Sequence, residues 1–303
     1  MKTDFTYKFK VINKCNFCRT DSSNFKILGK RMNCSQGKNP QNKIGISTTV
    51  VKCNNCGLIF SNPMPIPESI QDHYGVPPES YWKPEYFKVD DNYLKNEMDW
   101  LNKLKKIKAG MKALDIGAGL GKAMVIYEKN GFDTYGLEPS ITFYNKAIQK
   151  LKISEERLLN MSVEDADFPE NLFDFISFGV VLEHLYDPSL AIEKALNWLK
   201  PGGIIHIEVP HSKWLIHKLI NSLYSFRGMD YVGNLSPMHE PYHLYEFSLK
   251  SFEKNSKIND YTIVDSGYWV CQTYLPKVFD FPLRRIMKAT NSGMQLVIWL
   301  SKN

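Results

Sequence analysis

The sequence predicts an α/β protein with an open, mostly parallel sheet, preceded by a small cysteine-bearing unit. Between about residues 111 and 210, short apolar runs such as KALDIG, FDFISFGVV and IIHIEVP alternate with segments of helical length. Such alternation is typical of parallel strands joined by crossover helices. A glycine-rich turn follows the first run, in ALDIGAGLG, and five of the six cysteines lie in the first 62 residues.

Composition and charge narrow the class of protein. The chain has 303 residues, 43% of them hydrophobic, which is enough for one large core or two modest ones. The net charge of +6 comes with scattered lysines, which favours solvated surface over a nucleic-acid footprint. No apolar run approaches the ~18 residues of a membrane span, and the first residues, MKTDFTYKFK, lack the apolar stretch of a secretory signal. We therefore expect a cytoplasmic protein with reduced or metal-bound cysteines.

Two CxxC pairs characterise the N-terminal unit. Cys15 and Cys18 belong to CNFC, and Cys53 and Cys56 belong to CNNC. Four thiolates on two such knuckles can bind one Zn²⁺ tetrahedrally at ~2.3 Å, and a four-thiolate site is closed and hence structural. The knuckles are further apart than usual, so we expect a zinc ribbon with an insertion. The alternative is a set of reduced structural thiols.

The remaining two cysteines are not expected to bind the metal. Cys34 lies in the polar stretch between the knuckles and is interpreted as a spare thiol that could substitute for a ligand. Cys271 lies within a late strand-like run, YTIVDSGYWVC, and is expected to be a core residue.

The glycine turn has the form D-x-G-x-G-x-G, with Asp115 followed by Gly117, Gly119 and Gly121. A dinucleotide fingerprint, G-x-G-x-x-G/A, would place a small residue at position 122, where this chain has Lys122. A carboxylate at the end of the strand repels a pyrophosphate and attracts a cation. The turn therefore indicates a cationic cofactor rather than a dinucleotide.

This turn and four later motifs resemble the class I S-adenosylmethionine-dependent methyltransferases. Glu138 ends the second strand-like run in YGLEPS, where a carboxylate can accept hydrogen bonds from ribose hydroxyls. NMSVEDADFPENLFD resembles the loop that contacts adenine, ISFGVVLEHLYDP the fourth strand and its end, and LKPGGIIHIEVP the turn and fifth strand. The resemblance implies a Rossmann-like seven-stranded methyltransferase sheet, with a parallel core and antiparallel last strands.

The resemblance also implies which residues bind S-adenosylmethionine. They are Asp115, Gly117, Ala118, Gly119 and Gly121 in the turn, Glu138 and Pro139 at the ribose, Ser162 and Val163 at adenine, Gly179 near the aminoacyl group, and Tyr81. Tyr81 and Trp82 belong to an aromatic segment that relatives fold over the cofactor, where a ring can contact the sulfonium face-on. Ordinary core packing is the alternative for these two rings.

Three histidines are candidate general bases. Methyl transfer is an in-line displacement in which the enzyme positions the acceptor and, for a hydroxyl or carbon acid, removes a proton. His184, in EHL after the fourth strand, has the best location, with Glu183 beside it; the alternative is that the pair shapes the cofactor site. His239 and His243 lie in SPMHEPYHLYEFS after the fifth strand, where they can instead pin the cap by hydrogen bonds. His206 lies within the fifth strand and is expected to be structural.

We expect three units along the chain. Residues 1–62 form the zinc ribbon, residues 63–108 a helical and aromatic linker that serves as cofactor lid, and residues 109–303 the methyltransferase domain. A substrate-cap insertion is expected at about 211–250, with the amphipathic helix SKWLIHKLINSLYSF lining the acceptor pocket. A membrane anchor is the alternative for this helix, disfavoured because Lys213 and Lys218 are the only basic residues on its polar face. The last two strand-like runs are expected to pair antiparallel.

The combination resembles bacterial methyltransferases that carry an N-terminal zinc ribbon, among them sugar C-methyltransferases. It implies a small-molecule acceptor, foremost a sugar, nucleotide sugar or surface-glycan precursor. Those sugar enzymes carry a further C-terminal domain for which this chain has no room, which argues against sugar C-methylation. One alternative is RNA methylation, which the absence of a dense Arg/Lys stripe in the ribbon disfavours, so no nucleic-acid partner is expected. The other is a non-catalytic binding module. The sequence predicts neither the methylated atom nor the oligomeric state.

Overall fold

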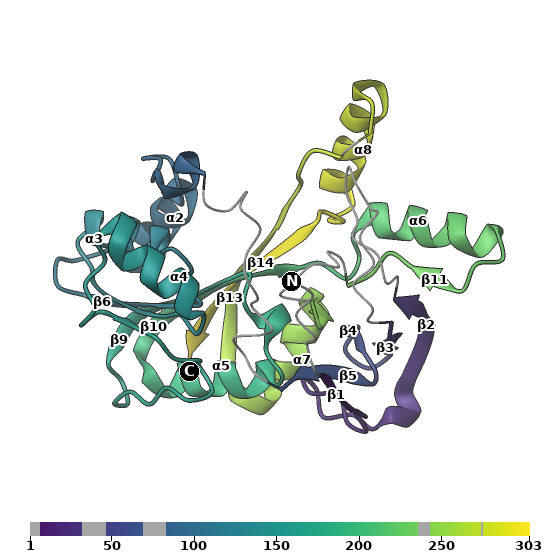
Figure 1. Cartoon of the computed structure of the whole chain (residues 1–303), viewed down its shortest axis with the longest axis horizontal. Coiled ribbons are helices and arrows are strands. Elements are labelled where there is room, and N and C mark those ends of the chain that lie inside the picture. The colour runs from purple at the N-terminus through teal and green to yellow at the C-terminus, as the bar shows by residue number, and fades with distance from the viewer. Residues whose placement is uncertain (1–6, 32–46, 69–82, 236–242, 274) are drawn as a thin grey trace, which may run out of the picture.

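A seven-stranded sheet forms the centre of the protein (Figure 1). The computed structural model describes residues 7–31, 47–68, 83–235, 243–273 and 275–303. Within them the strand order is β13–β14–β10–β9–β6–β7–β8. The strands are β6 (Lys112–Ile116), β7 (Asp133–Leu137), β8 (Leu158–Leu159), β9 (Phe173–Gly179), β10 (Leu199–Pro210), β13 (Tyr261–Trp269) and β14 (Gln295–Lys302).

Strand direction confirms the expected parallel core and antiparallel end. Strands β6 to β10 pair in parallel, and β14 runs antiparallel to both β10 and β13. The chain proceeds from β6 to β7 and β8 on one side, then returns to place β9 and β10 on the other. The order therefore reverses between β6 and β9, the place where open α/β sheets bind ligands at the carboxyl ends of their strands.

Helices cover both faces of this sheet because its strands alternate apolar side chains between the faces. In β9, Phe175 packs with α2 (Lys95–Lys105) and α3 (Lys122–Lys129), while Ile176 faces α5 (Pro188–Trp198) and α7 (Leu249–Asn259). The other helices are α4 (Ile141–Lys146), α6 (Leu215–Phe226) and α8 (Lys277–Ala289), with short turns at Ser22–Asn24, Pro84–Phe87, Ala147–Leu151 and Leu182–His184.

A second sheet joins two segments that are far apart in sequence. Its order is β11–β2–β3–β4–β12. Strands β2 (Phe25–Arg31), β3 (Thr49–Cys53) and β4 (Ile59–Ser61) come from the cysteine-bearing segment, and β11 (Tyr231–Val232) and β12 (Tyr245–Glu246) from the expected cap. A separate ribbon pairs β1 (Tyr7–Lys10) with β5 (Met64–Pro67). The segments that the sequence assigned to different units thus share one sheet (Figure 1).

The segment after β13 differs from the expectation for Cys271. The expected strand ends at Trp269, where β13 stops pairing with Gln295 of β14, so Cys271 lies beyond the strand and is only half-buried. The linker between the last two strands forms α8, which stands away from the sheet (Figure 1). No helix in the described ranges is long and apolar enough to cross a membrane.

The close packing around β7 gives a test of this fold. A Cβ added at Gly136 would lie 2.5 Å from Met124 Sδ and 2.9 Å from Leu158 Cδ1. We expect Gly136→Ala to lower the free energy of unfolding by about 1–3 kcal/mol, because overpacking forces neighbours to shift. Gly267→Ala, where a Cβ meets nothing within 4 Å, is the matched control. Urea denaturation measures both, and equal stability of the two variants would contradict the packing around Gly136.

Candidate active site

A row of polar side chains crosses three neighbouring strands at the switch point of the sheet. Asp115 of β6 is paired in register with Ser177 of β9, which is paired with His206 of β10. The Ser177 hydroxyl donates a hydrogen bond to Asp115 Oδ1 at 2.7 Å. Glu208 lies two residues after His206 and therefore faces the same side. The pleat thus gathers two acids, a hydroxyl and an imidazole on one face.

This row forms the floor of a cavity of about 260 Å³ at the ends of the strands. Its other lining residues include Tyr86, Tyr93, Leu94, Gly117, Ala118, Lys122, Phe143, Gly179 and Val180. Burial raises the pKa of the Asp115 carboxyl and, together with the charge of Glu97, that of Glu208, to about 7 in each case. Removing carboxylates from water costs free energy unless a cation compensates them. The cavity is therefore suited to a positively charged ligand.

The three turn glycines have left-handed backbones and serve different purposes. Their φ angles are 73° at Gly117, 56° at Gly119 and 77° at Gly121, a region that glycine adopts at little cost. A Cβ would lie 2.5 Å from Val181 Cγ2 at Gly117 and 2.8 Å from Ile153 Cγ1 at Gly121, but would meet nothing within 4 Å at Gly119. The outer two glycines thus allow close packing, and Gly119 leaves open space.

Glu138 ties the glycine turn to the end of β7. Its Oε2 accepts a hydrogen bond from the Gly119 N–H at 2.7 Å, and its Oε1 accepts one from the Ser140 N–H at 2.8 Å. Burial raises the pKa of Glu138 to about 7, against the lowering effect of these two bonds. Each carboxylate oxygen can accept more than one hydrogen bond. Ribose binding by Glu138 therefore stays a prediction that its present contacts permit.

A smaller cavity of about 30 Å³ adjoins the first. It is lined by Pro139, Ser162, Val163, His184 and others, and shares Gly117 with the larger cavity. The Ser162 hydroxyl donates to Asp165 Oδ2 at 2.8 Å, which orders this loop. The structure therefore places the residues expected at adenine beside the candidate base.

The end of β9 carries backbone strain. Val180 has a φ of 60°, which is a genuine outlier for a β-branched residue. Its N–H donates to the Glu208 carbonyl at 3.0 Å, which holds the turn in place. A Cβ added at the neighbouring Gly179 meets nothing within 4 Å, so the chain here borders open space. Strain of this kind concentrates at functional sites, and no local sequence signal indicated it.

The buried Glu183 and the partly buried His184 and His243 form a cluster, of which His184 lines the smaller cavity. Their ligand atoms lie within 4.8 Å of one another. Glu183 Oε1 is 4.0 Å from His184 Nε2 and 3.9 Å from His243 Nε2, and the two rings have centroids 4.9 Å apart. Both Glu183 oxygens are buried and accept no hydrogen bond from any described residue. Burial raises the pKa of Glu183 to about 8.

The four predicted cysteine ligands come together. The Sγ atoms of Cys15 and Cys56 are 3.7 Å apart, those of Cys18 and Cys53 are 3.6 Å apart, and all four lie within 4.8 Å of one another. A tetrahedral four-thiolate zinc site with bonds of ~2.3 Å has sulfur–sulfur separations of about 3.8 Å. Asn55 donates to Cys18 Sγ at 3.4 Å, as outer contacts to metal-binding thiolates do. The donor set therefore fits Zn²⁺.

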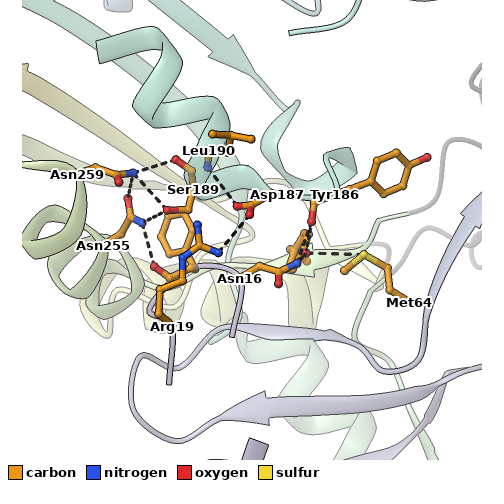
Figure 2. Close-up of polar contacts among 11 residues, drawn as sticks. Asn16, Arg19, Met64, Tyr186, Asp187, Ser189, Leu190, Asn255 and Asn259 are labelled. Carbon is orange, nitrogen blue, oxygen red and sulfur yellow. Dashed lines mark hydrogen bonds and ion pairs between the residues drawn. The ribbon is translucent and has the colours of Figure 1, made fainter. Parts of the chain in front are cut away.

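The cysteine loops are docked on the segment that follows His184 (Figure 2). The Asn16 side chain donates to the Tyr186 carbonyl at 2.8 Å, and Arg19 pairs with Asp187 at 3.2 Å. Asn255 of α7 donates to the Phe17 carbonyl at 2.9 Å and to Ser189 Oγ at 2.8 Å. The cysteine loops are thus bound by hydrogen bonds and an ion pair to residues that closely follow the candidate base in sequence.

Tyr81, Trp82, His239 and Cys34 fall outside the described residues. His206, expected to be structural, lines the larger cavity, and burial lowers its pKa to about 3.

Sequence reasoning also missed part of the cavity lining, namely Tyr86, Tyr93, Ser177 and Glu208. Period-two alternation in IIHIEVP could have placed Glu208 beside His206. The two tyrosines lie within the aromatic linker expected at 63–108, although neither was singled out as a site residue.

Strand order, glycine turn and acid-lined cavity define the class as an α/β protein of the methyltransferase type. A methyltransferase-domain family model matches residues 91–265, more than half of the chain. The protein belongs to this methyltransferase-domain family.

Named relatives share a shorter segment. A ubiquinone biosynthesis O-methyltransferase of Nitrobacter winogradskyi is 33% identical over 110 residues, 35% of this chain and 41% of the relative. Phosphoethanolamine N-methyltransferase 1 of Zea mays is 30% identical over 105 residues, 33% of this chain and 21% of the relative. The matched segment thus spans less than half of these relatives.

Among solved structures, an S-adenosylmethionine-dependent methyltransferase from Mesorhizobium loti is similar at 12% identity and a TM-score of 0.49, covering 71% of this chain and all (100%) of that one. One from Archaeoglobus fulgidus is similar at 14% identity and a TM-score of 0.48, covering 74% and 100%. Neither score reaches 0.5, so the fold is defined by the chain's own strand order.

The cysteine cluster gives a test of metal binding. We expect Cys18→Ser to lose most of the bound zinc and to lower the melting temperature, because zinc binding contributes directly to folding. Zinc content by elemental mass spectrometry and thermal unfolding measure the effect. Cys271→Ser, outside the cluster, is the matched control and should keep its zinc. Equal zinc content in the two variants would contradict the assignment.

Proposed function

We propose that the protein transfers a methyl group from S-adenosylmethionine to a small-molecule nucleophile, with His184 as general base. One observation carries the proposal. The acid-lined cavity adjoins a second cavity beside His184, and both are lined by Gly117 at the switch point of the sheet. Membership of the methyltransferase-domain family supports the reaction class.

The lining of the larger cavity fits the charge of this cofactor. S-adenosylmethionine, when bound, supplies an electrophilic methyl group on a cationic sulfonium. The carboxylates of Asp115 and Glu208 would compensate its positive charge, since Asp115 is buried, Glu208 is partly buried, and both face the cavity. The open space at Gly119 and Gly179 allows a ligand to approach the backbone. Glu138, Pro139, Ser162 and Val163 are proposed to hold the nucleoside part.

The cluster beside the smaller cavity is suited to moving a proton. His184 lines that cavity together with Gly117, which both cavities share, so we place the acceptor on the Gly117 side of His184, where its imidazole can accept the proton, and the nucleoside on the side of Ser162 and Val163. Glu183 lies 4.0 Å from His184 Nε2. An imidazolium formed there would lower the raised pKa of Glu183, and the carboxylate that results would stabilise the imidazolium. His243, at 3.9 Å from the same Glu183 oxygen, is the second candidate base. Glu183 acts through the histidines and is therefore a positioning residue.

The class of acceptor rests on weaker support. The relatives reported above are named for ubiquinone biosynthesis and phosphoethanolamine methylation. These names lend no support to the sugar or surface-glycan precursor expected from the sequence, which stays a prediction. The acceptor can be found by incubating the protein with labelled S-adenosylmethionine and fractionated small-molecule extracts.

Replacing the base tests the mechanism. We expect His184→Gln to lower kcat by about 10²-fold or more, because the acceptor proton loses its base, while cofactor affinity changes little. Label transfer to the extract and calorimetry with S-adenosylmethionine measure the two effects. His243→Gln is the matched comparison, since its ring neighbours the same carboxylate. Full activity in both variants would contradict a histidine base, and absence of cofactor binding in the wild type would contradict the proposed function.

The buried acids predict a pH dependence of cofactor binding. With pKa values of about 7, Asp115 and Glu208 are mostly protonated at pH 6 and mostly ionised at pH 8. Ionised carboxylates attract the sulfonium, so affinity should rise by up to about tenfold per carboxylate over this range, with proton release. The effect of pH on the stability of the ligand-free protein is opposite. Because the pKa values of both carboxyls are raised by folding, they lower the free energy of unfolding as pH rises from their ordinary pKa values to about 7.

Calorimetry in buffers of different ionisation enthalpy measures this proton release. Asp115→Asn should flatten the profile. S-adenosylhomocysteine, which lacks the sulfonium, is the control ligand and should show a shallower dependence. An affinity that falls as pH rises would contradict the role of these acids.

A further inference from the structure

The surface of α8 differs from that of the other helices. Its apolar residues Val278, Phe279, Phe281 and Ile286 are 71%, 58%, 61% and 47% exposed. At about 100° per residue, Val278, Phe279 and Ile286 fall within one arc of about 100°. Large exposed apolar faces on soluble domains mark interaction sites. We call this arc the apolar face of α8.

Cations line one edge of this face. Lys277, Arg285 and Lys288 are exposed and occupy the adjoining arc of about 80°. The Arg285 guanidinium lies 4.3 Å from the Phe281 ring centroid, which places the charge beside the aromatic surface. The helix's single acid, Asp280, accepts hydrogen bonds from the Thr273 N–H and hydroxyl and is only partly exposed. The exposed surface of α8 is thus apolar and cationic, with no exposed carboxylate of its own.

The opposite side attaches α8 to the protein. Met287 is fully buried and its carbonyl accepts the Ser292 N–H at 3.0 Å. Figure 1 shows α8 standing away from the sheet at the end of β13. The strand ends that carry it, Trp269 and Gln295, lie level with Pro210 at the carboxyl end of β10. This helix therefore extends from the same edge of the sheet as the acid-lined cavity.

We propose that α8 docks the protein on the surface of a bilayer containing anionic phospholipid. An amphipathic helix with aromatic and aliphatic residues on one side and Lys/Arg beside them lies in the interface, its apolar face among the acyl chains and its cations at the phosphates. Each cation near an anionic surface adds attraction that salt weakens. Phe279 and Ile286 supply the buried area, and Lys277, Arg285 and Lys288 the charge complementarity.

A second copy of the chain suits this face less well. An isologous dimer brings the same patch of both subunits together. The cationic edges of two α8 helices would then meet, and the helix has no exposed acid to neutralise them.

Vesicle flotation tests the proposal with the full chain. We expect the wild type to float with vesicles of phosphatidylcholine mixed with phosphatidylglycerol, to float far less with phosphatidylcholine alone, and to lose binding as salt rises. The double variant Phe279→Ser/Ile286→Ser should reduce partitioning by about tenfold or more. The double variant Lys277→Glu/Lys288→Glu should abolish the preference for phosphatidylglycerol.

Matched controls distinguish binding through α8 from nonspecific adsorption to vesicles through other exposed residues. Phe9→Ser removes a ring that is 52% exposed on β1, and Lys257→Glu changes a charge on α7; both should float like the wild type. Calorimetry with S-adenosylmethionine, which the α8 variants should leave unchanged, separates this inference from the proposed function. Absence of wild-type flotation with the anionic vesicles would overturn the proposal. So would equal loss in Phe9→Ser, or a sedimentation-detected dimer that the Phe279→Ser/Ile286→Ser variant dissolves.

Discussion

The docking of the cysteine loops on the segment after His184 is the contact on which the site depends. Asn16 and Arg19 lie on the first knuckle and bind Tyr186 and Asp187, two and three residues beyond the candidate base. Loops carry many backbone groups that need partners, and a buried group left without one costs about 1–3 kcal/mol. A metal bound by the four thiolates would therefore also order the residues beside the cavity.

The same contact explains why the N-terminal segment and the cap share a sheet. Tyr245 of β12 donates from its hydroxyl to the Tyr186 carbonyl at 2.9 Å and accepts from Asn16 at 2.6 Å. The side chain of the next residue, Glu246, accepts a hydrogen bond from the Leu235 N–H at 2.6 Å, which attaches the segment after β11 to β12. His243 stands two residues before Tyr245, so the strand pairing of β12 with β4 sets its position next to Glu183. The cap is thus positioned by the cysteine-bearing strands rather than by the central sheet alone.

The chemistry of the site follows from acids that the fold places out of water. Asp115 and Glu208 face one cavity, and Glu183 lies beneath the other with no hydrogen bond from described residues. Buried carboxylates oppose folding unless a positive charge approaches them, which is why such groups gather where a ligand or a proton is handled. The strained backbone at Val180 also lies at this site, between Glu208 of β10 and the glycine turn, where an unfavourable conformation is retained as the buried acids are.

Local patterns were sufficient for much of the fold. The alternation of apolar runs and helices, the spacing of Gly117, Gly119 and Gly121, and the two CxxC pairs each act over a few residues. The sequence by itself therefore determined the parallel sheet, the glycine turn and the cysteine cluster. Tertiary structure decided which side chains meet. Glu183 and His243 are separated by 60 positions, and Asn16 and Tyr245 by 229, and no local spacing encodes their approach. Strand register and packing between distant segments bring them together, and the same packing leaves the apolar face of α8 uncovered.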